Sequence, residues 1–222
     1  MAEPLLALEA VSLADPRGGW VFRGLDWRLE RGGRFHAAAG AGGGCSALLR
    51  LCAGLAEPDA GRVLLDGLPL TPAGRHPFLE RGALGWVPTD GGLAMNLTLV
   101  ENVALPLRFA QGLDSNEAHR RAWEWLERAG LEALAERRPA LPANRDSWLA
   151  ALARAGAMGA RLWLVDRPAG SLDGLAVAAA ERTLAAAGRD PEVAMVLVGA
   201  DLAHLGRELR IGGGRVTEGG EP

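Results

Sequence analysis

The chain of 222 residues contains no tyrosine and no lysine, so all 24 of its basic residues are arginine. A coding bias toward GC-rich codons is the interpretation that we favour, because it also accounts for the many alanines and glycines. The bias has a chemical consequence. No lysine ammonium is available anywhere in this sequence to bind a phosphate, a task for which the compact charge of lysine is well suited.

Cysteines and long apolar runs are also scarce. Cys45 and Cys52 lie seven residues apart, which fits two turns of one helix better than a metal site or a disulfide framework and indicates a reducing compartment. No run of 18 apolar residues exists, and the N-terminal stretch lacks the basic start of a signal peptide, so we expect no membrane span. The net charge of −3 argues against a nucleic-acid partner.

The apolar pattern predicts an α/β fold. Short apolar runs separated by helical stretches are typical of a mostly parallel sheet with helices on both faces. Before this pattern, alternating residues predict an antiparallel β region. We expect strands over Leu5–Leu13, Val21–Leu29, Arg34–Ala39, Arg62–Leu65, Leu84–Pro88, Arg161–Asp166 and Val193–Val198, and helices over Ser46–Leu55, Asp146–Ala157 and Gly174–Ala187. Residues 97–137 are also helical in pattern, so the predicted domains are a core of 1–90 with 158–222 and an inserted helical subdomain of 91–157.

A glycine-rich stretch, AAAGAGGGCSALLRLCAGL, runs from Ala37 to Leu55 and has the rhythm of a phosphate-binding loop. Such a loop follows the pattern G-x-x-x-x-G-K-[ST], with main-chain N–H groups around the phosphates, a lysine on the terminal phosphates and a hydroxyl on magnesium. Ser46 fixes the register and places Cys45 where the lysine belongs. Two interpretations stay open, a turn that needs no ligand and a weak phosphate cradle. The candidate nucleotide-binding residues are Gly40, Gly42, Gly43, Gly44, Cys45, Ser46 and Ala47.

Further motifs extend this pattern along the chain. Between Leu5 and Val216 the sequence resembles, in register, the ATP-binding subunit of ABC transporters. The stretches that carry the resemblance are SALLRLCAGLAEPDAGRVLLDGLPL, ALGWVPTDGGLAMNLTLVENVALPLR, ALARAGAMGARLWLVDRPAGSLD and VAMVLVGADLAHL. Within the family, the second stretch is most similar to the ATPases of Mla-type lipid transporters. The resemblance implies a P-loop NTPase fold, ATP with magnesium as cofactors, and a place on the cytoplasmic face of the membrane beside a permease.

The catalytic positions that the resemblance implies carry other residues in this chain. The family has a lysine, a glutamine, a glutamate and a histidine where this sequence has Cys45, Thr89, Arg167 and Ala200. Its signature motif corresponds to residues 142–146, which include Ala143, Asn144 and Arg145. The magnesium-binding positions Ser46 and Asp166 remain, as do the D-loop residues Ser171, Leu172 and Asp173.

Three functions are compatible with this pattern. We expect a homologue that has lost hydrolysis, binds ATP and magnesium weakly or not at all, and docks on an integral-membrane permease as a homodimer or beside an active ABC ATPase. The alternatives are a nucleotide sensor, in which Arg167 binds the terminal phosphate, and a working ATPase. In the homologue that has lost hydrolysis, Arg167 is expected to neutralise Asp166 or Asp173 rather than to bind a phosphate. Leu97, Leu99, Val100, Val103, Leu105 and Leu107 are expected to form the permease-docking groove within Gly91–Arg108.

Overall fold

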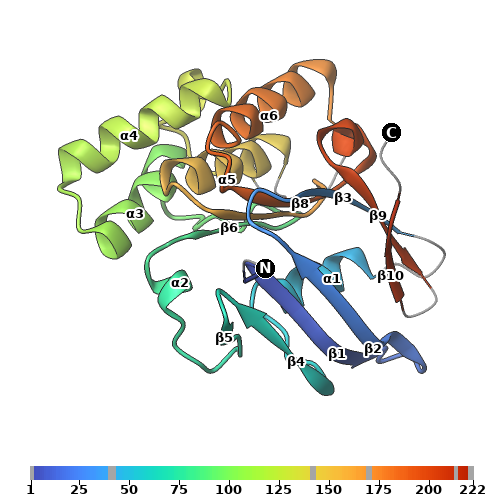
Figure 1. Ribbon diagram of the computed structural model, residues 1–222. Coiled ribbons are helices and arrows are strands. Elements are labelled where there is room, and N and C mark those ends of the chain that lie inside the picture. Colours follow the sequence, from blue (N-terminus) through green and yellow to red (C-terminus); the bar gives the residue numbers. More distant parts are fainter. Residues whose placement is uncertain (1–2, 40–43, 141–143, 169–171, 213–214, 220–222) are drawn as a thin grey trace. The chain divides into compact units, whose positions relative to one another are not determined.

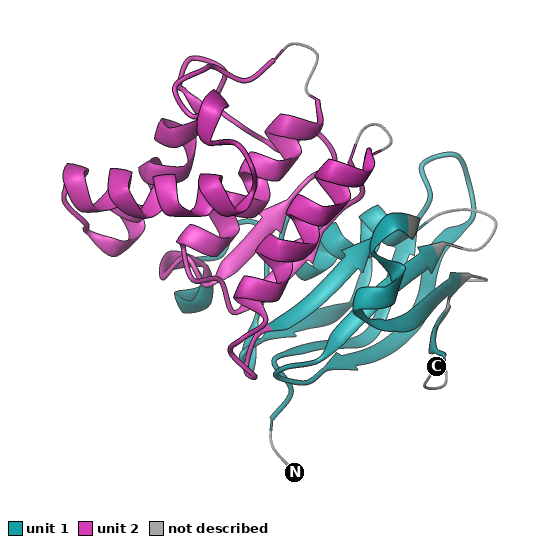
Figure 2. Cartoon of the chain, turned by 90° about the horizontal axis from the view of Figure 1, so that it is seen from above, with its two compact units in different colours: residues 1–78, 194–222 teal, residues 79–193 magenta. Residues whose placement is uncertain are grey.

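The computed structural model describes residues 3–39, 44–140, 144–168, 172–212 and 215–219. The chain forms two compact units, residues 1–78 with 194–222 and residues 79–193 (Figure 2). The predicted helical subdomain of 91–157 lies within the second unit, and its proposed boundaries stay a prediction. We describe each unit by itself.

An antiparallel sheet makes up one part of the first unit (Figure 1). Its strand order is β2-β1-β4-β5, with β1 at Leu6–Ala14, β2 at Trp20–Leu29, β4 at Ala60–Leu65 and β5 at Leu68–Pro69. Buried and exposed residues alternate along β2, as expected for a strand with one face on the core. This confirms the predicted antiparallel β region.

Parallel strands make up the other part of the first unit. The central strand β3 (Arg34–Ala39) pairs in parallel with β8 (Ala194–Val198) and β9 (Arg207–Gly212), and β10 (Arg215–Glu218) pairs antiparallel with β9. After β3 the chain enters α1 (Cys45–Cys52), and after β8 it enters the 3-10 helix η2 (Ala200–Leu205). The strand β8 is buried along its whole length, which is why its sequence is a continuous apolar run.

The second unit is rich in helix. Its strands β6 (Leu84–Val87) and β7 (Leu162–Val165) pair in parallel. Its helices are α3 at Leu99–Gln111, α4 at Ser115–Arg128, η1 at Glu132–Leu134, α5 at Arg145–Ala157 and α6 at Gly174–Ala187, and the short α2 (Pro77–Glu80) precedes them. Helix α5 packs against α3, α4 and α6, and ten of its residues are buried. Gly156 of α5 leaves room for the Trp125 ring of α4, because a Cβ at Gly156 would lie 2.2 Å from that ring.

Parallel strand pairs together with the helices confirm the predicted α/β fold class. Within the residues that the structure describes, none of the helices has the length and apolar character that crossing a membrane requires.

Candidate functional site

The candidate phosphate loop ends at the start of α1. Gly40, Gly42 and Gly43 lie outside the described residues, and Gly44 is the N-cap of the helix with φ 108°. A Cβ at this position would lie 3.0 Å from Cγ2 of Ile211, and the backbone conformation itself favours glycine. No side chain caps α1, and its first turn contains no acidic residue.

Cys45 opens α1 at the position of the family lysine. Its side chain is 6% exposed, and Sγ lies 3.7 Å from the main-chain oxygen of Ala37 on β3. The thiol is therefore turned toward the strand and supplies no positive charge. Ser46 and Ala47 follow in the first turn and are half-buried. Cys52 closes the helix, and burial raises the pKa of its thiol.

Asp166 follows β7 and is held by its main chain. Its amide donates to the oxygen of Val87 at 2.8 Å, and its carbonyl accepts from Nε1 of Trp148 at 2.8 Å. The carboxylate is buried, and its Oδ1 accepts the main-chain N–H of Arg167 at 2.9 Å. The Arg167 side chain is exposed, and the structure records no ion pair between its guanidinium and any other described residue.

The signature position lies at the start of α5. Oδ1 of Asn144 accepts the main-chain N–H groups of Asp146 at 3.0 Å and Ser147 at 3.2 Å, so the helix start is capped by its own side chain. Ala143 lies outside the described residues. Arg145 forms an ion pair with Asp173 and a longer one, at 3.4 Å from Nε to Oδ1, with Asp146.

The described D-loop residues lie at the start of α6. Oδ1 of Asp173 caps this helix by accepting the N–H of Ala176 at 2.9 Å, and Leu172 before it is half-buried. Ser171 lies outside the described residues. Because Arg145 pairs with Asp173, the signature and D-loop positions of this chain are joined directly. Arg167 was predicted to neutralise Asp166 or Asp173, and among the described residues the ion-pair partner of Asp173 is Arg145 instead.

Thr89 lies in the turn after β6 and is half-buried. Arg154 of α5 holds this turn by donating to the carbonyl oxygens of Gly91 at 3.1 Å and Gly92 at 2.9 Å. Burial lowers the pKa of Arg154, and the Asp90 carboxylate raises it in part. Sequence reasoning missed this role, because the contact joins residues 62 and 63 positions apart.

The expected docking groove is the clearest correction. Val100, Val103 and Leu107 are buried where α3 packs against α4 and α5, so they belong to the packed interior of the unit. Leu99 is also buried, but it lines a small cleft of about 260 Å³ together with Leu134 and Asn144. Instead, the apolar side chains that the segment exposes include Met95 at 37% and Leu105 at 40%, with Phe109 beyond them at 79%. The prediction placed the buried stripe of an amphipathic helix on its outer face.

Asn102 fixes the path of the chain before α3. Its buried side chain accepts the N–H of Ala94 at 2.7 Å and donates to the carbonyls of Ala94, Leu97 and Thr98 at 2.9–3.3 Å. A buried amide with all these partners is satisfied and rigid. The segment is thus built as a fixed shape, which the apolar pattern alone did not indicate.

Ala200 opens η2 directly after Gly199. The carbonyl of Gly199 lies 2.9 Å from Nε2 of His36 on β3, and His36 is buried. The site residues are thus divided between the units. Gly44–Ala47 and Ala200 belong to the first, and Thr89, residues 144–145, 166–167 and 172–173 belong to the second.

Comparison with known proteins agrees with this architecture. The model of the family described as ABC transporter matches residues 22–170, well over half of the chain. The chain belongs to the ABC transporter family. Its relatives include the cell division ATP-binding protein FtsE of Haemophilus influenzae, 35% identical over 69% of this chain and 70% of FtsE. They also include the lipoprotein-releasing system ATP-binding protein LolD of Idiomarina loihiensis, 30% identical over 95% of this chain and 93% of LolD.

A solved ABC structure shares the fold along nearly the whole chain. The dimeric bacterial ABC transporter cassette MJ0796 has a TM-score of 0.85 and 25% identity, and the match covers 96% of this chain and 97% of the cassette. The chain spans only about half of some other curated ABC relatives. The predicted family and fold are therefore confirmed, whereas the residues of the site rest on the resemblance.

Proposed function

We propose that this ABC nucleotide-binding domain does not hydrolyse ATP and serves as a structural or regulatory subunit on a membrane permease. The observation that carries the proposal is Cys45. A buried cysteine side chain, which carries no positive charge, takes the position of the phosphate-binding lysine, and the sequence has no lysine to replace it. Phosphoryl transfer depends on positioning the phosphates and on stabilising their negative charge. The missing lysine charge therefore removes a group that the reaction needs.

Arg167 supports the proposal from the second unit. It follows the buried Asp166 at the position where the family has the glutamate that orients the attacking water, and a guanidinium cannot accept a proton from that water. Each such lost group costs about 3–4 kcal/mol of transition-state stabilisation, although losses of this kind are not additive. At Thr89 and Ala200, as at Arg167, the chain has no carboxylate or imidazole to activate water.

The partners are inferred from the family. We propose an integral-membrane permease and either a second copy of this chain or an active ABC ATPase as the other half of a dimer. The relatives support this in their own cases, since MJ0796 is a dimeric cassette and LolD belongs to a lipoprotein-releasing system. A lipid cargo, as in Mla-type transporters, rests on the finer sequence resemblance. These assignments place the protein at the cytoplasmic face of a membrane.

A second candidate function is nucleotide sensing, and the open start of α1 favours it. Gly44 provides no capping side chain, so the first N–H groups of the helix suit a phosphate. The family resemblance assigns magnesium to the positions of Ser46 and Asp166, and Arg167 is a residue type that binds phosphate well. These residue types are suited to binding a nucleotide, but they do not include the groups that hydrolysis requires.

Steady-state phosphate release tests the primary proposal. We expect the same rate from the wild-type protein and from Cys45→Ala with ATP and magnesium, since Cys45 contributes nothing to turnover. Restoring Cys45→Lys and Arg167→Glu together is also expected to leave the protein inactive, because residues 142–146 still differ from the signature. Turnover by the wild-type protein above the Cys45→Ala rate would overturn the proposal.

Thermal shift with ATP and magnesium separates the two candidates. A sensor gains stability from the nucleotide as binding theory requires, and Arg167→Ala removes the gain. A purely structural subunit shows no shift at millimolar nucleotide. Arg161→Ala is the matched control, because Arg161 is another exposed arginine of the same unit and lies outside the predicted site.

A further inference from the structure

The small cleft beside Leu99 lies within the second unit and is lined by residues of three segments. These are the start of α3, the stretch from Leu134 to Ala140, and the start of α5. Leu99, Leu134 and Pro139 are the larger apolar residues of its wall. Its volume of about 260 Å³ is below the range of about 300–1,000 Å³ that ligand pockets occupy, so it has room for one side chain or a small ion.

Ser147 in the first turn of α5 contributes a buried hydroxyl to the cleft. The residue is 1% exposed, and its Oγ has no hydrogen-bond partner among the residues that the structure describes. Its main-chain N–H donates to Oδ1 of Asn144, and its carbonyl oxygen faces Gly91, which does not line the cleft. The side chain is therefore the part of Ser147 that belongs to the cleft wall. Buried polar atoms nearly always have a partner, so this hydroxyl indicates a group that binds in the cleft.

Two exposed arginines, Arg137 and Arg138, line the same cleft. The structure records no ion pair or hydrogen bond between the Arg137 guanidinium and any described residue. Hydrogen bonds from Thr98 are the main cause of the lowered pKa of Glu101, and the charge of Arg138 lowers that pKa further. Glu101 does not line the cleft, and its carboxylate accepts the N–H of Thr98 at 2.7 Å. Both arginines are therefore able to pair with an anion in the cleft.

The other polar side chains of the cleft wall already have partners. Oδ1 of Asp146, the one carboxylate of the wall, lies 3.4 Å from Nε of Arg145. The Asn144 side chain accepts two main-chain N–H groups at the start of α5. The wall thus combines two arginines with a single carboxylate that another arginine already neutralises in part. This charge balance favours an acidic group as the occupant of the cleft.

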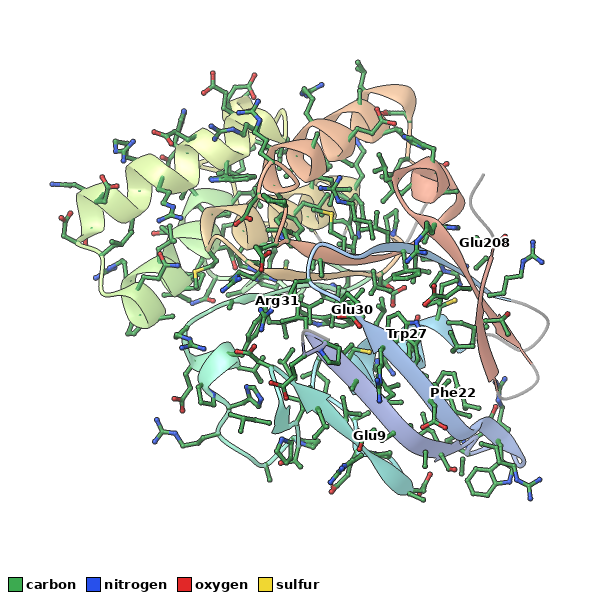
Figure 3. All side chains as sticks on the ribbon, viewed as in Figure 1. Glu9, Phe22, Trp27, Glu30, Arg31 and Glu208 are labelled. Carbon is green, nitrogen blue, oxygen red and sulfur yellow. The ribbon has the colours of Figure 1, made fainter. Side chains whose placement is uncertain are left out.

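A larger cleft of about 680 Å³ in the first unit shows the contrast. Its charged residues include Glu9 on β1, which Figure 3 labels, and Glu218 on β10. Glu9 lies 2.6 Å from Nε of Arg62, and Glu218 lies 3.6 Å from the guanidinium of Arg207. Ion pairs within the first unit therefore hold these carboxylates, whereas the guanidinium of Arg137 has no such partner among the described residues.

We propose that the cleft beside Leu99 receives a glutamate side chain from a partner protein. The carboxylate pairs with Arg137 and Arg138, because a planar guanidinium matches a carboxylate in geometry as well as in charge. It also accepts a hydrogen bond from the Ser147 hydroxyl, and the methylene groups of the glutamate pack on Leu99. The proposal does not rest on the proposed function, since it requires neither a nucleotide nor the loss of hydrolysis.

An NMR titration of the full chain, labelled with ¹⁵N, tests the proposal with two matched compounds. These are N-acetylglutamate N-methylamide and N-acetylglutamine N-methylamide, which differ only in the charge of the side chain. We expect saturable shifts of the Arg137 and Arg138 Nε–H signals and of the Ser147 amide with the glutamate compound, and at least about fivefold weaker binding of the glutamine compound. Equal affinities, shifts confined to other residues, or no saturation would overturn the proposal. Inorganic phosphate that binds as tightly as the glutamate compound would also overturn it, because the cleft would then be a site for a free anion.

Variants of the cleft wall provide the controls. Arg137→Gln is expected to weaken binding of the glutamate compound by at least about fivefold. Arg189→Gln changes an exposed arginine of the same unit outside the cleft and should leave the affinity unchanged. Equal losses in these two variants would show nonspecific charge attraction and would contradict the site.

Ser147→Ala separates a binding role from a structural one. This variant should weaken binding without lowering the free energy of unfolding, because its Oγ has no partner to lose in the free protein. A lower free energy of unfolding, or unchanged binding, would show that the hydroxyl does not serve the cleft and would contradict the proposal. None of these experiments uses ATP, so failure here leaves the proposed function untouched.

Discussion

Two helix starts of this protein correspond to the two sites that face phosphates in the ABC family, and they are built in opposite ways. Helix α1 begins at Gly44, with no capping side chain and no acidic residue in its first turn. Helix α5 begins at Asn144, whose side chain accepts two main-chain N–H groups, and Asp146 lies in its first turn. One start leaves its N–H groups for an anion, whereas the other satisfies them internally.

The difference shows that the two halves of the family site have not changed alike. In the phosphate-loop pattern, α1 keeps Gly44 and Ser46, whereas Cys45 stands at the lysine position and Ala39 at the first glycine position. At α5 the chain has replaced the cradle by its own contacts, since Arg145 is joined to Asp173. Under the proposed function, α1 is the side that would hold a nucleotide, and the start of α5 is the side that would no longer receive one.

The largest effect is expected at the start of α1. Gly44→Ala forces a side chain into φ 108° and against Ile211, so the free energy of unfolding should fall by about 2–3 kcal/mol in urea denaturation. Gly18→Ala is the matched control, because Gly18 has φ 103° and open space around a Cβ. An equal loss in both variants would show that the contact with Ile211 does not constrain the start of α1.

A smaller loss is expected at the start of α5. Asn144→Ala removes the acceptor of two N–H groups and should lower the free energy of unfolding by about 1 kcal/mol. Asn116→Ala changes an exposed asparagine in the first turn of α4 and should cost less than about 0.5 kcal/mol. If Asn144→Ala lowers the free energy of unfolding no more than this control does, the Asn144 side chain does not stabilise the start of α5.

The ion pair between Arg145 and Asp173 is expected to contribute less again. Both side chains are about half exposed, so a double-mutant cycle with Arg145→Ala and Asp173→Asn should give a coupling below about 1 kcal/mol. Asparagine retains the oxygen that caps α6. The coupling should shrink in high salt, and a coupling that salt leaves unchanged would contradict an exposed pair.

The smallest effect concerns the start of α3, a third capped helix. Hydrogen bonds from the main chain and side chain of Thr98 hold the pKa of Glu101 below its ordinary value of 4.5. A lowered pKa means that the stabilising contribution is complete above that value and is lost as the pH falls through the pKa of the folded state. Acid unfolding should therefore show a shallower pH dependence in Glu101→Gln than in the wild-type protein, and identical profiles would exclude the contribution.

Local patterns predicted much of the fold. The range Gly174–Ala187 was predicted as a helix and agrees with α6, because Asp173 is a capping residue and Gly188 can end the helix. The continuous helical pattern of 97–137 divides into separate helices, and Gly112 in the left-handed conformation ends the first of them. The short β5 and α2 were missed, since two to four residues carry no periodic signal.

The site was less predictable, because its contacts join distant residues. The cap of α5 by Asn144 is a local contact of the kind that spacing along the chain can indicate. The pairing of Arg145 with Asp173 spans the whole of α5 and β7, and the contact of His36 with Gly199 spans 163 residues, so neither can be read from spacing. The buried stripe of α3 was mistaken for a docking groove, because apolar periodicity does not say which partner covers a helix face.

Single-turnover hydrolysis, with the protein in excess over ATP and with magnesium present, tests the central claim most directly. Ser46→Ala, purified in the same way, is the reference, because it removes the hydroxyl that would hold magnesium. We expect phosphate to appear at the same background rate in both samples. A faster burst from the wild-type protein, absent from Ser46→Ala, would show that the chain hydrolyses ATP and would contradict the account.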